Sequence, residues 1–221
     1  MRVGNYWYWL HVPELERGID IAALISPLRY DVLVRRDFFS FYAEHRDLFF
    51  SDFEAFAGLV KHSPYYTWHV ASEVIRTRPY LAGNTQRLWA EFVDQIHKAA
   101  ELYESMTNHG VDPQFPITLK TAERILPPTA ARSAPPTGKL VSARYFLADG
   151  CHRLALLMHL GYTVLPARYF RVKCFREFSP FDSTSLLARS LPIEPSAYFA
   201  FLSGRYCPPL VFERKDDFLE H

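Results

Sequence analysis

The chain has 221 residues and a mass of 25.7 kDa; 49% of its residues are hydrophobic, 22% are charged, and the formal net charge is +1. This composition excludes a disordered or low-complexity chain, because the apolar fraction is large enough to offset the entropy lost on folding. No apolar run approaches the roughly 20 residues that span a bilayer, so we expect no membrane span. The near-zero net charge gives no electrostatic attraction for nucleic acid, which we do not expect as a partner.

Cysteine usage and the first residues indicate the compartment. The three cysteines, Cys151, Cys174 and Cys207, are an odd number at irregular spacing, which is not typical of a disulfide framework. The first residues lack the apolar stretch and small-residue cleavage site of a secretory signal. We therefore predict a cytoplasmic protein.

Residues 1–82 are the most aromatic part of a chain that is 16% aromatic, and we predict that they pack as a segment on a smaller core. We interpret Ile19–Ile25 as a short strand or turn, and Phe38–His45 and Asp52–His62 as short amphipathic helices. Tyr6–Trp9 is the expected exception to core packing, since four consecutive aromatic side chains cannot all face one core. Exposed rings in this segment could bind a protein partner.

Residues 83–173 carry the clearest secondary-structure signals. Apolar residues at three- and four-residue steps predict a helix from Asn84 to Asn108, with Asn84 or Thr85 as its N-cap. The proline-rich stretch 126–139 is predicted to be a long, mobile, exposed loop. The other predicted elements are a short strand after Pro116, strands at 140–147 and 163–172, and a helix at 151–160 that Gly161 stops.

Residues 174–218 are predicted to form a helical C-terminal extension. Its helices would start near Asp182 or Ser183 and at Ser196, and the second would end at Gly204. Residues 219–221 resemble the start of an expression tag, and the fold prediction leaves them out. The predicted fold class is α/β (α+β): a small mixed sheet with helices, extended at both ends by helical segments.

The segment 145–157 carries the predicted chemistry: a strand, a tight turn at Asp149 and Gly150, and a helix that starts with the Cys-His-Arg sequence of residues 151–153. Backbone N–H groups at a helix N-terminus attract negative charge, and a glycine lets an anion approach closely. The histidine and arginine add side-chain donors. Asp149 could hold Mg²⁺ or accept a proton from an attacking hydroxyl.

A structural interpretation of the same turn stays open at this point. Asp149 can be a simple helix cap and Arg153 a surface residue, since strand–Asp–Gly–helix turns are common. His159 lies on an otherwise apolar helix, which favours a packed core histidine over a ligand.

The stretch from Phe115-Pro116-Ile117 through Asp149-Gly150-Cys151-His152-Arg153 to Leu165-Pro166-Ala167 resembles the ParB/sulfiredoxin superfamily. In that family a Pro-Ile strand, a hairpin and a strand lead into a Gly-x-His-Arg turn and helix. A following glycine and a Val/Ile-Pro-Ala strand complete the pattern. The resemblance covers about residues 112–173 and implies a ParB/sulfiredoxin-like core within 83–173 that binds nucleotide phosphates at the turn.

Free-serine kinases of this family carry the Asp-Gly-x-His-Arg turn. The resemblance therefore implies an ATP-dependent phosphotransferase, with ATP or another nucleoside triphosphate and Mg²⁺ as cofactors and a hydroxyl of a small molecule, such as a sugar, as substrate. The implied catalytic residues are Asp149, Cys151 and His152. The implied nucleotide-binding residues are Gly150, Cys151, His152, Arg153 and Arg35, and the implied metal ligand is Asp149.

Other members of the superfamily imply other activities. Cys151 matches the catalytic cysteine of sulfiredoxins, which reduce a cysteine sulfinic acid with ATP, although Asp149 replaces the family glycine there. A ParB-like DNA binder would need a helix-turn-helix and a basic face. Arg29, Arg35 and Arg36 could form a small basic patch, but a nucleotide phosphate explains them as well as DNA does. A non-catalytic nucleotide-binding interaction module is the remaining alternative.

A second catalytic acid is harder to assign than the turn itself. The candidates are Asp31, Asp37 and Glu123, and each is better explained as a solvated surface charge or a cap. The kinase-like activity and the cysteine-based activity predict different outcomes for substitutions of Asp149 and Cys151.

Overall fold

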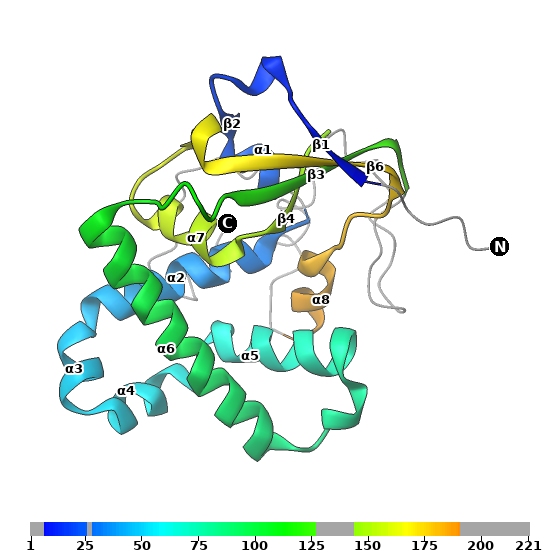
Figure 1. Cartoon of the computed structure of the whole chain (residues 1–221). Helices are drawn as coiled ribbons and strands as arrows, with labels where there is room; N and C mark the ends of the chain where they lie inside the picture. Colours follow the sequence, from blue (N-terminus) through cyan, green and yellow to red (C-terminus); the bar gives the residue numbers. More distant parts are fainter. Residues whose placement is uncertain (1–6, 26–27, 127–143, 191–221) are drawn as a thin grey trace.

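The computed structural model describes residues 7–25, 28–126 and 144–190, which form a mixed α+β arrangement of helices and two small sheets (Figure 1). The larger sheet has four strands, in the order β1 (Trp7–Leu10), β6 (Phe170–Phe178), β3 (Ile117–Ile125) and β4 (Phe146–Asp149), and the smaller sheet pairs β2 (Ile19–Asp20) with β5 (Val164–Leu165). The long helices α2 (Tyr30–Glu44) and α6 (Thr85–His109) lie on the same side of the larger sheet (Figure 1). The predicted α+β class is confirmed, and the ParB/sulfiredoxin-like core stays a prediction.

The larger sheet is built on two central strands of equal length. β3 (Ile117–Ile125) and β6 (Phe170–Phe178) run parallel to each other. β1 (Trp7–Leu10) pairs antiparallel with β6 at one edge, and β4 (Phe146–Asp149) pairs antiparallel with β3 at the other. β4 therefore ends at the edge of the sheet, and a tight turn connects its last residue to the start of a helix.

Alternation along the central strands separates an inner face of the sheet from an outer face. Ile117 and Leu119 of β3 and Val172 of β6 are buried on the inner face, where they belong to the hydrophobic core, and Cys174 of β6 is buried on the same face. The residues between them point to the outer face and are partly or fully exposed. Such a one-sided pattern is expected where helices cover only one face of a sheet.

The helices and short strands that complete the fold follow in chain order. They are η1 (Pro13–Leu15), β2 (Ile19–Asp20), α1 (Ile21–Ile25), α2 (Tyr30–Glu44), α3 (Arg46–Ser51), α4 (Phe53–Val60), α5 (Pro64–Ala71), η2 (Ser72–Thr77), η3 (Pro79–Leu81), α6 (Thr85–His109), α7 (Cys151–His159), β5 (Val164–Leu165), η4 (Ala167–Tyr169) and α8 (Ser183–Ser190). Among the helices of the described residues, none combines the length and the apolar character needed to cross a membrane.

Helix α6 confirms the strongest prediction from the sequence. The Asn84 side chain accepts a hydrogen bond from the Arg87 N–H at 3.1 Å and so caps the N-terminus. The helix ends before Gly110, whose φ of +76° lies in the left-handed region that favours glycine. The predicted apolar stripe is buried, with Phe92 and Ile96 fully inaccessible to solvent.

Aromatic side chains fill the space between the helices, as predicted. Tyr42 and Tyr65 are among the largest fully buried side chains, and the Phe38 and Tyr65 ring centroids lie 4.7 Å apart. Trp7, Tyr8 and Trp9 are the predicted exception and are 49%, 51% and 49% exposed; the four-residue strand β1 explains this, because it lies at the edge of the sheet.

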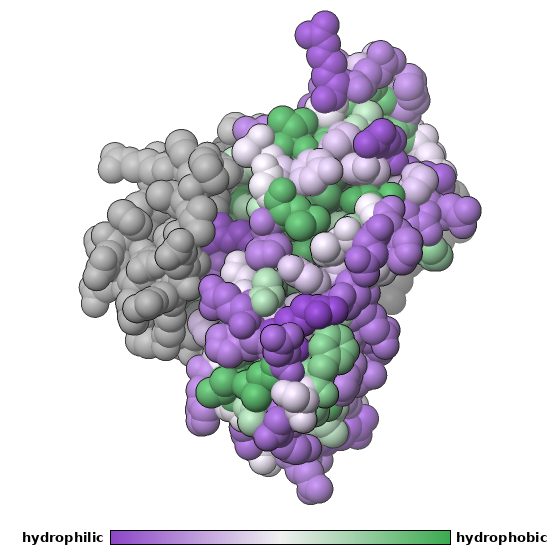
Figure 2. Space-filling model, turned by 90° about the vertical axis from the view of Figure 1, so that its left-hand side faces the viewer, coloured by the Kyte–Doolittle hydropathy of each residue, from purple (hydrophilic) through white to green (hydrophobic). Residues whose placement is uncertain are grey.

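The exposed apolar surface is divided on the face shown in Figure 2. Apolar residues gather there in an upper and a lower group, and hydrophilic residues lie between the two groups. A partner that stays bound usually covers one continuous apolar patch. This face therefore gives no argument for a protein partner, and the partner predicted for residues 1–82 stays a prediction.

The C-terminal half corrects two predicted elements. The continuous strand predicted at 163–172 is wrong, because the chain forms β5, then η4, and only then β6. Pro166 precedes η4 and has no N–H for a sheet ladder, which explains the interruption. β6 continues to Phe178, so residues 174–178 belong to the central sheet and not to a helical extension. The helix predicted near Ser183 is confirmed as α8.

The N-terminal half also differs from its predicted helical character. Residues 7–10 form an edge strand of the main sheet. Ile19–Ile25 divides into the two-residue strand β2 and the short helix α1, and the helix predicted at 38–45 is the second half of α2. The strand pairing of β1 with β6 is a long-range contact that no local pattern predicts.

Several predictions concern residues that the structure does not describe. The loop predicted at 126–139, apart from its first residue, lies outside the described residues. The same holds for the start of the strand predicted at 140–147, the helix predicted at 196–204 and the tag remnant at 219–221.

Candidate functional site

The turn singled out in the sequence has the predicted form. β4 ends at Asp149, Gly150 makes the turn, and α7 begins at Cys151. Gly150 has a φ of +87°, and a Cβ atom there would lie 2.9 Å from Cγ1 of Ile117. The N–H of Gly150 donates to Oδ1 of Asp149 at 2.7 Å. The turn therefore requires glycine for both its backbone conformation and its close contact with β3.

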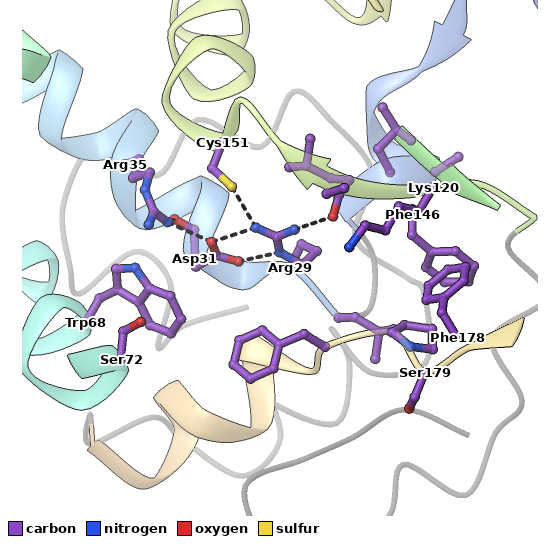
Figure 3. A pocket seen from close by; sticks show the side chains of 17 residues that line it. Arg29, Asp31, Arg35, Trp68, Ser72, Lys120, Phe146, Cys151, Phe178 and Ser179 are labelled. Atoms are coloured by element: carbon purple, nitrogen blue, oxygen red, sulfur yellow. Dashed lines mark hydrogen bonds and ion pairs between the residues drawn. The ribbon is translucent and has the colours of Figure 1, made fainter. Parts of the chain in front are cut away.

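A cavity of about 190 Å³ lies beside the first residue of α7 (Figure 3). Its polar lining includes Cys151, Arg29, Arg35 and Lys120, and Trp68 of α5 also lines it. Phe146 and Phe178 lie at the end of the cavity away from Arg35 and Trp68 (Figure 3), and Phe181 is a further aromatic lining residue. The cavity thus joins an end with arginine and sulfur groups to an aromatic end.

Asp31 is the centre of the polar end. Its carboxylate accepts from Arg29 Nε at 2.8 Å and Arg35 Nη1 at 2.7 Å, and the Ser183 hydroxyl at the start of α8 also donates to it. Burial alone would raise the pKa of Asp31, but the two guanidinium groups outweigh it and hold the pKa well below its usual range. Asp31 is therefore a buried anion and not the solvated charge that the sequence allowed.

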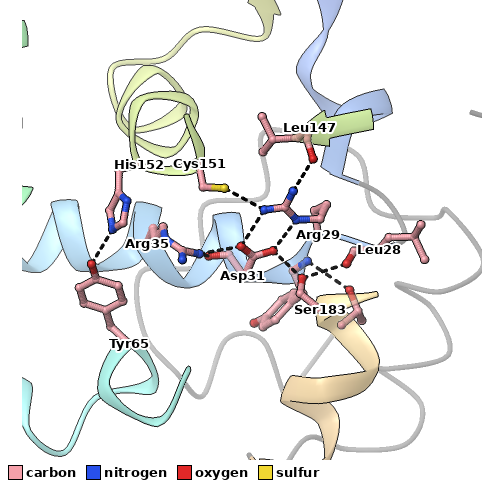
Figure 4. Close-up of polar contacts among 11 residues, drawn as sticks. Leu28, Arg29, Asp31, Arg35, Tyr65, Leu147, Cys151, His152 and Ser183 are labelled. Carbon is pink, nitrogen blue, oxygen red and sulfur yellow. Dashed lines mark hydrogen bonds and ion pairs between the residues drawn. The ribbon is translucent and has the colours of Figure 1, made fainter. Parts of the chain in front are cut away.

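Cys151 faces this ion-pair cluster (Figure 4). Arg29 Nη2 donates to Cys151 Sγ at 2.9 Å, and Arg29 Nη1 donates to the Leu147 carbonyl of β4 at 2.6 Å. Burial opposes the charge of Arg29, but Asp31 and Cys151 more than compensate and raise its pKa. Arg29 is thus a fixed cation that touches the sulfur, a setting typical of reactive cysteines.

His152 points away from the cavity and toward α5 (Figure 4). Its Nε2 lies 2.6 Å from the Tyr65 hydroxyl. Burial and the nearby Arg35 lower the pKa of His152 to about 3, so its ring is neutral. Burial raises the pKa of Tyr65 to about 12, which leaves the phenol as the donor of this hydrogen bond. His152 does not line the cavity, and its predicted role in phosphate binding stays a prediction.

Asp149 and Arg153 lie together, outside the cavity lining. The Asp149 side chain is 79% exposed, and its Oδ2 is 3.9 Å from Arg153 Nη2. Arg153 packs over Gly150, and its buried Nη1 has no hydrogen-bond partner in the part of the chain that the structure describes. Within the described ranges, no group of three or more His, Cys, Asp or Glu side chains is placed to hold a metal ion. Asp149 would therefore bring a single carboxylate to a metal–nucleotide complex.

The sequence prediction missed the partnership between Arg29, Asp31 and Cys151. Arg35 was assigned to phosphate binding and does line the cavity with Cys151. The available signal was the spacing of Asp31 and Arg35, which are four residues apart and face the same side of α2. Arg36 instead pairs with its neighbour Asp37, whereas Arg29 and Arg35 both pair with Asp31.

Comparisons of the chain with protein-family models, with curated proteins and with solved structures found no match.

Proposed function

We propose that the protein is a cysteine-dependent enzyme, with Cys151 as its nucleophile and a small anionic group on its substrate. The hydrogen bond from Arg29 Nη2 to Cys151 Sγ carries this proposal, because it places a fixed positive charge on the sulfur at a cavity wall. The resemblance to sulfiredoxins implies the same chemistry for this position. Asp149, on which the phosphotransferase prediction depends, lies outside the cavity lining.

The size and charge of the cavity support a small anion as the bound group. Pockets for whole drug-sized ligands occupy about 300–1,000 Å³, whereas this cavity has about 190 Å³. The Arg35 guanidinium carbon lies 5.4 Å from the Trp68 ring centroid, and the buried Arg35 Nε has no hydrogen-bond partner among the residues that the structure describes. A ligand oxygen would satisfy this donor. A phosphoryl or sulfinyl group fits this description better than a complete nucleotide does.

The proposed step is a displacement by sulfur. The Cys151 thiolate attacks an electrophilic atom of the substrate, a bond forms between Sγ and that atom, and the bond to the leaving oxygen breaks. The leaving oxygen takes the bonding electron pair and then a proton from solvent. Arg35 would stabilise the remaining substrate oxygens. Asp31 acts as a positioning residue, because it holds both guanidinium groups in place.

Alkylation with iodoacetamide, followed by mass spectrometry of peptides, tests this proposal. We expect Cys151 to react much faster than Cys174, the matched control, which is 5% exposed within β6. Inorganic phosphate or sulfate should slow the reaction of Cys151, and Arg35→Ala should remove this protection. Equal reactivity of the two cysteines, or no protection by either anion, would contradict the proposal.

A second candidate is the nucleotide-dependent phosphotransferase. The Arg153 guanidinium favours it, because its Nη2 lies next to the Gly150 turn and its buried Nη1 has no hydrogen-bond partner among the described residues, so that a phosphate at the turn would accept from it. Calorimetric titration with ATP and Mg²⁺ tests this candidate, with Arg153→Ala as the control. Absence of heat from any nucleoside triphosphate would exclude it.

Two substitutions distinguish the cysteine-dependent enzyme from the phosphotransferase once an activity has been measured. Cys151→Ser should abolish the cysteine-dependent reaction and leave phosphoryl transfer nearly unchanged. Asp149→Asn should abolish phosphoryl transfer and spare the cysteine chemistry, since its side chain is not part of the cavity lining.

A further inference from the structure

Around Trp9, the outer face of the larger sheet carries aromatic and basic side chains next to one another, and Glu177, which pairs with Arg124, lies farther along β6. Trp9 pairs with Lys173, which pairs in turn with Lys120, so the three lie in one row across β1, β6 and β3. Trp7 pairs with Phe175 in the neighbouring row. Adjacent strands are about 4.8 Å apart, and same-face residues along a strand are about 6.8 Å apart. The part of this face around Trp9 and Lys173 therefore presents rings and cations close to one another.

The ammonium group of Lys173 lies against the aromatic rings of Trp7 and Trp9. Its Nζ lies 4.2 Å from the Trp7 ring centroid and 4.9 Å from the Trp9 centroid, and Arg171 lies 6.0 Å from the Trp9 centroid. No carboxylate of the described residues is within ion-pair distance of Lys173 or Arg171. Both charges are thus available to an anion, beside two rings that are each 49% exposed.

A groove extends this surface at the end of β1. It has a volume of about 440 Å³ and is lined by Trp9, His11, Glu16 and Arg171, together with apolar residues of β1, η1, η4 and β6. Glu16 lies 3.9 Å from the His11 ring, so the cation of this groove that has no carboxylate beside it in the described part of the chain is Arg171. A volume in this range holds a planar ring system with its attached groups. The opposite end of the row reaches Lys120, which also lines the cavity beside Cys151.

We propose that this outer face is a binding surface for single-stranded nucleic acid. Unpaired bases stack on exposed aromatic rings, and lysine or arginine between the rings binds the phosphates. The net charge of +1 predicts no nucleic-acid partner for the whole chain, but it is a sum that includes acidic residues of other surfaces. What matters for a single strand is the local charge beside Trp7 and Trp9.

An anionic membrane is the main competing partner for tryptophan and lysine side chains. Membrane binding needs apolar groups that project far enough to enter the lipid layer. Trp7 and Trp9 are only half exposed, and they lie on a sheet face with cations between and beside them. This arrangement favours stacking on a flat surface over insertion.

A fluorescein-labelled oligouridylate of roughly 12 nucleotides, titrated with the full chain at about 50 mM salt, tests the proposal by fluorescence anisotropy. We expect binding that weakens as salt increases and that quenches tryptophan fluorescence. Lys173→Glu and Trp9→Ala should each weaken binding by about tenfold or more. Arg171→Glu is the second charge variant if circular dichroism shows that Trp9→Ala is poorly folded.

The matched control is Lys98→Glu, which makes the same charge change on α6, where the lysine side chain is 70% exposed. It should leave the affinity within about twofold of the wild type. Absence of binding, equal losses in Lys98→Glu and Lys173→Glu, or equally tight binding of a duplex would overturn the proposal. Binding to phosphatidylserine vesicles without binding to the oligonucleotide would assign the face to a membrane instead. Cys151→Ser should not change oligonucleotide binding. The binding proposal and the cysteine-enzyme proposal can therefore be refuted independently of each other.

Discussion

Replacing Asp31 with asparagine keeps the shape of the side chain and removes the negative charge that Arg29 and Arg35 share. The carboxylate is 1% exposed and accepts three hydrogen bonds from these two guanidinium groups, at 2.7–3.0 Å. Removing one partner of a buried ion pair leaves the other charge buried without compensation, which lowers the free energy of unfolding by about 3–5 kcal/mol. For a chain of this size we expect the melting temperature to fall by about 6–20 °C.

Urea denaturation followed by circular dichroism measures this loss, and Asp94→Asn is the matched control. Asp94 forms an ion pair of 2.6 Å with Lys98, shorter than either pair of Asp31, but its side chain is 62% exposed. An exposed pair of this kind contributes only about 0.3–0.5 kcal/mol. If Asp31→Asn loses no more free energy of unfolding than Asp94→Asn, the reasoning that burial makes this cluster important is refuted.

Three further changes test the turn, the longest helix and the buried histidine. Gly150→Ala should destabilise the protein by about 1–3 kcal/mol in thermal unfolding, because φ there is +87° and a Cβ would approach Ile117 to 2.9 Å; an unchanged melting temperature would contradict this. Asn84→Ala should cost about 1 kcal/mol in urea through loss of the α6 cap, whereas Asn84→Ser should keep most of the stability. Burial holds the pKa of His152 at about 3, below the unfolded value of about 6.5, so the unfolded chain binds the extra proton between these pH values. The free energy of unfolding should therefore fall by at most about 1.4 kcal/mol per pH unit below pH of about 6.5, and His152→Gln should flatten this slope; parallel wild-type and variant curves would refute the assignment.

Local features of the chain were predictable because they depend on neighbours in sequence. The stripe and caps of α6 follow from residue spacing, and the glycine turn before α7 follows from a strand pattern that meets a helix pattern. The prediction that most rings pack, with Tyr6–Trp9 as the exception, also needed only composition and order; residues 7–9 confirm it.

The tertiary structure decided which side chains meet. Arg29 and Cys151 are 122 positions apart, and their hydrogen bond exists because α2 and α7 pack against each other and place the two in contact. The same packing buries Asp31, which alone in sequence looks like a solvated acid, and turns His152 toward Tyr65. Strand order is set in the same way, since β1 joins β6 only after distant segments have come together.

The sequence by itself therefore determined the glycine turn, the helix and its caps, and the aromatic character of the core, because these depend on local backbone geometry and hydrophobic periodicity. Only the tertiary structure placed a cysteine, two arginines and a buried carboxylate around one cavity. It also set tryptophans beside lysine on an open sheet face. Both outcomes depend on which surfaces of distant segments bury each other, and local periodicity does not encode that choice.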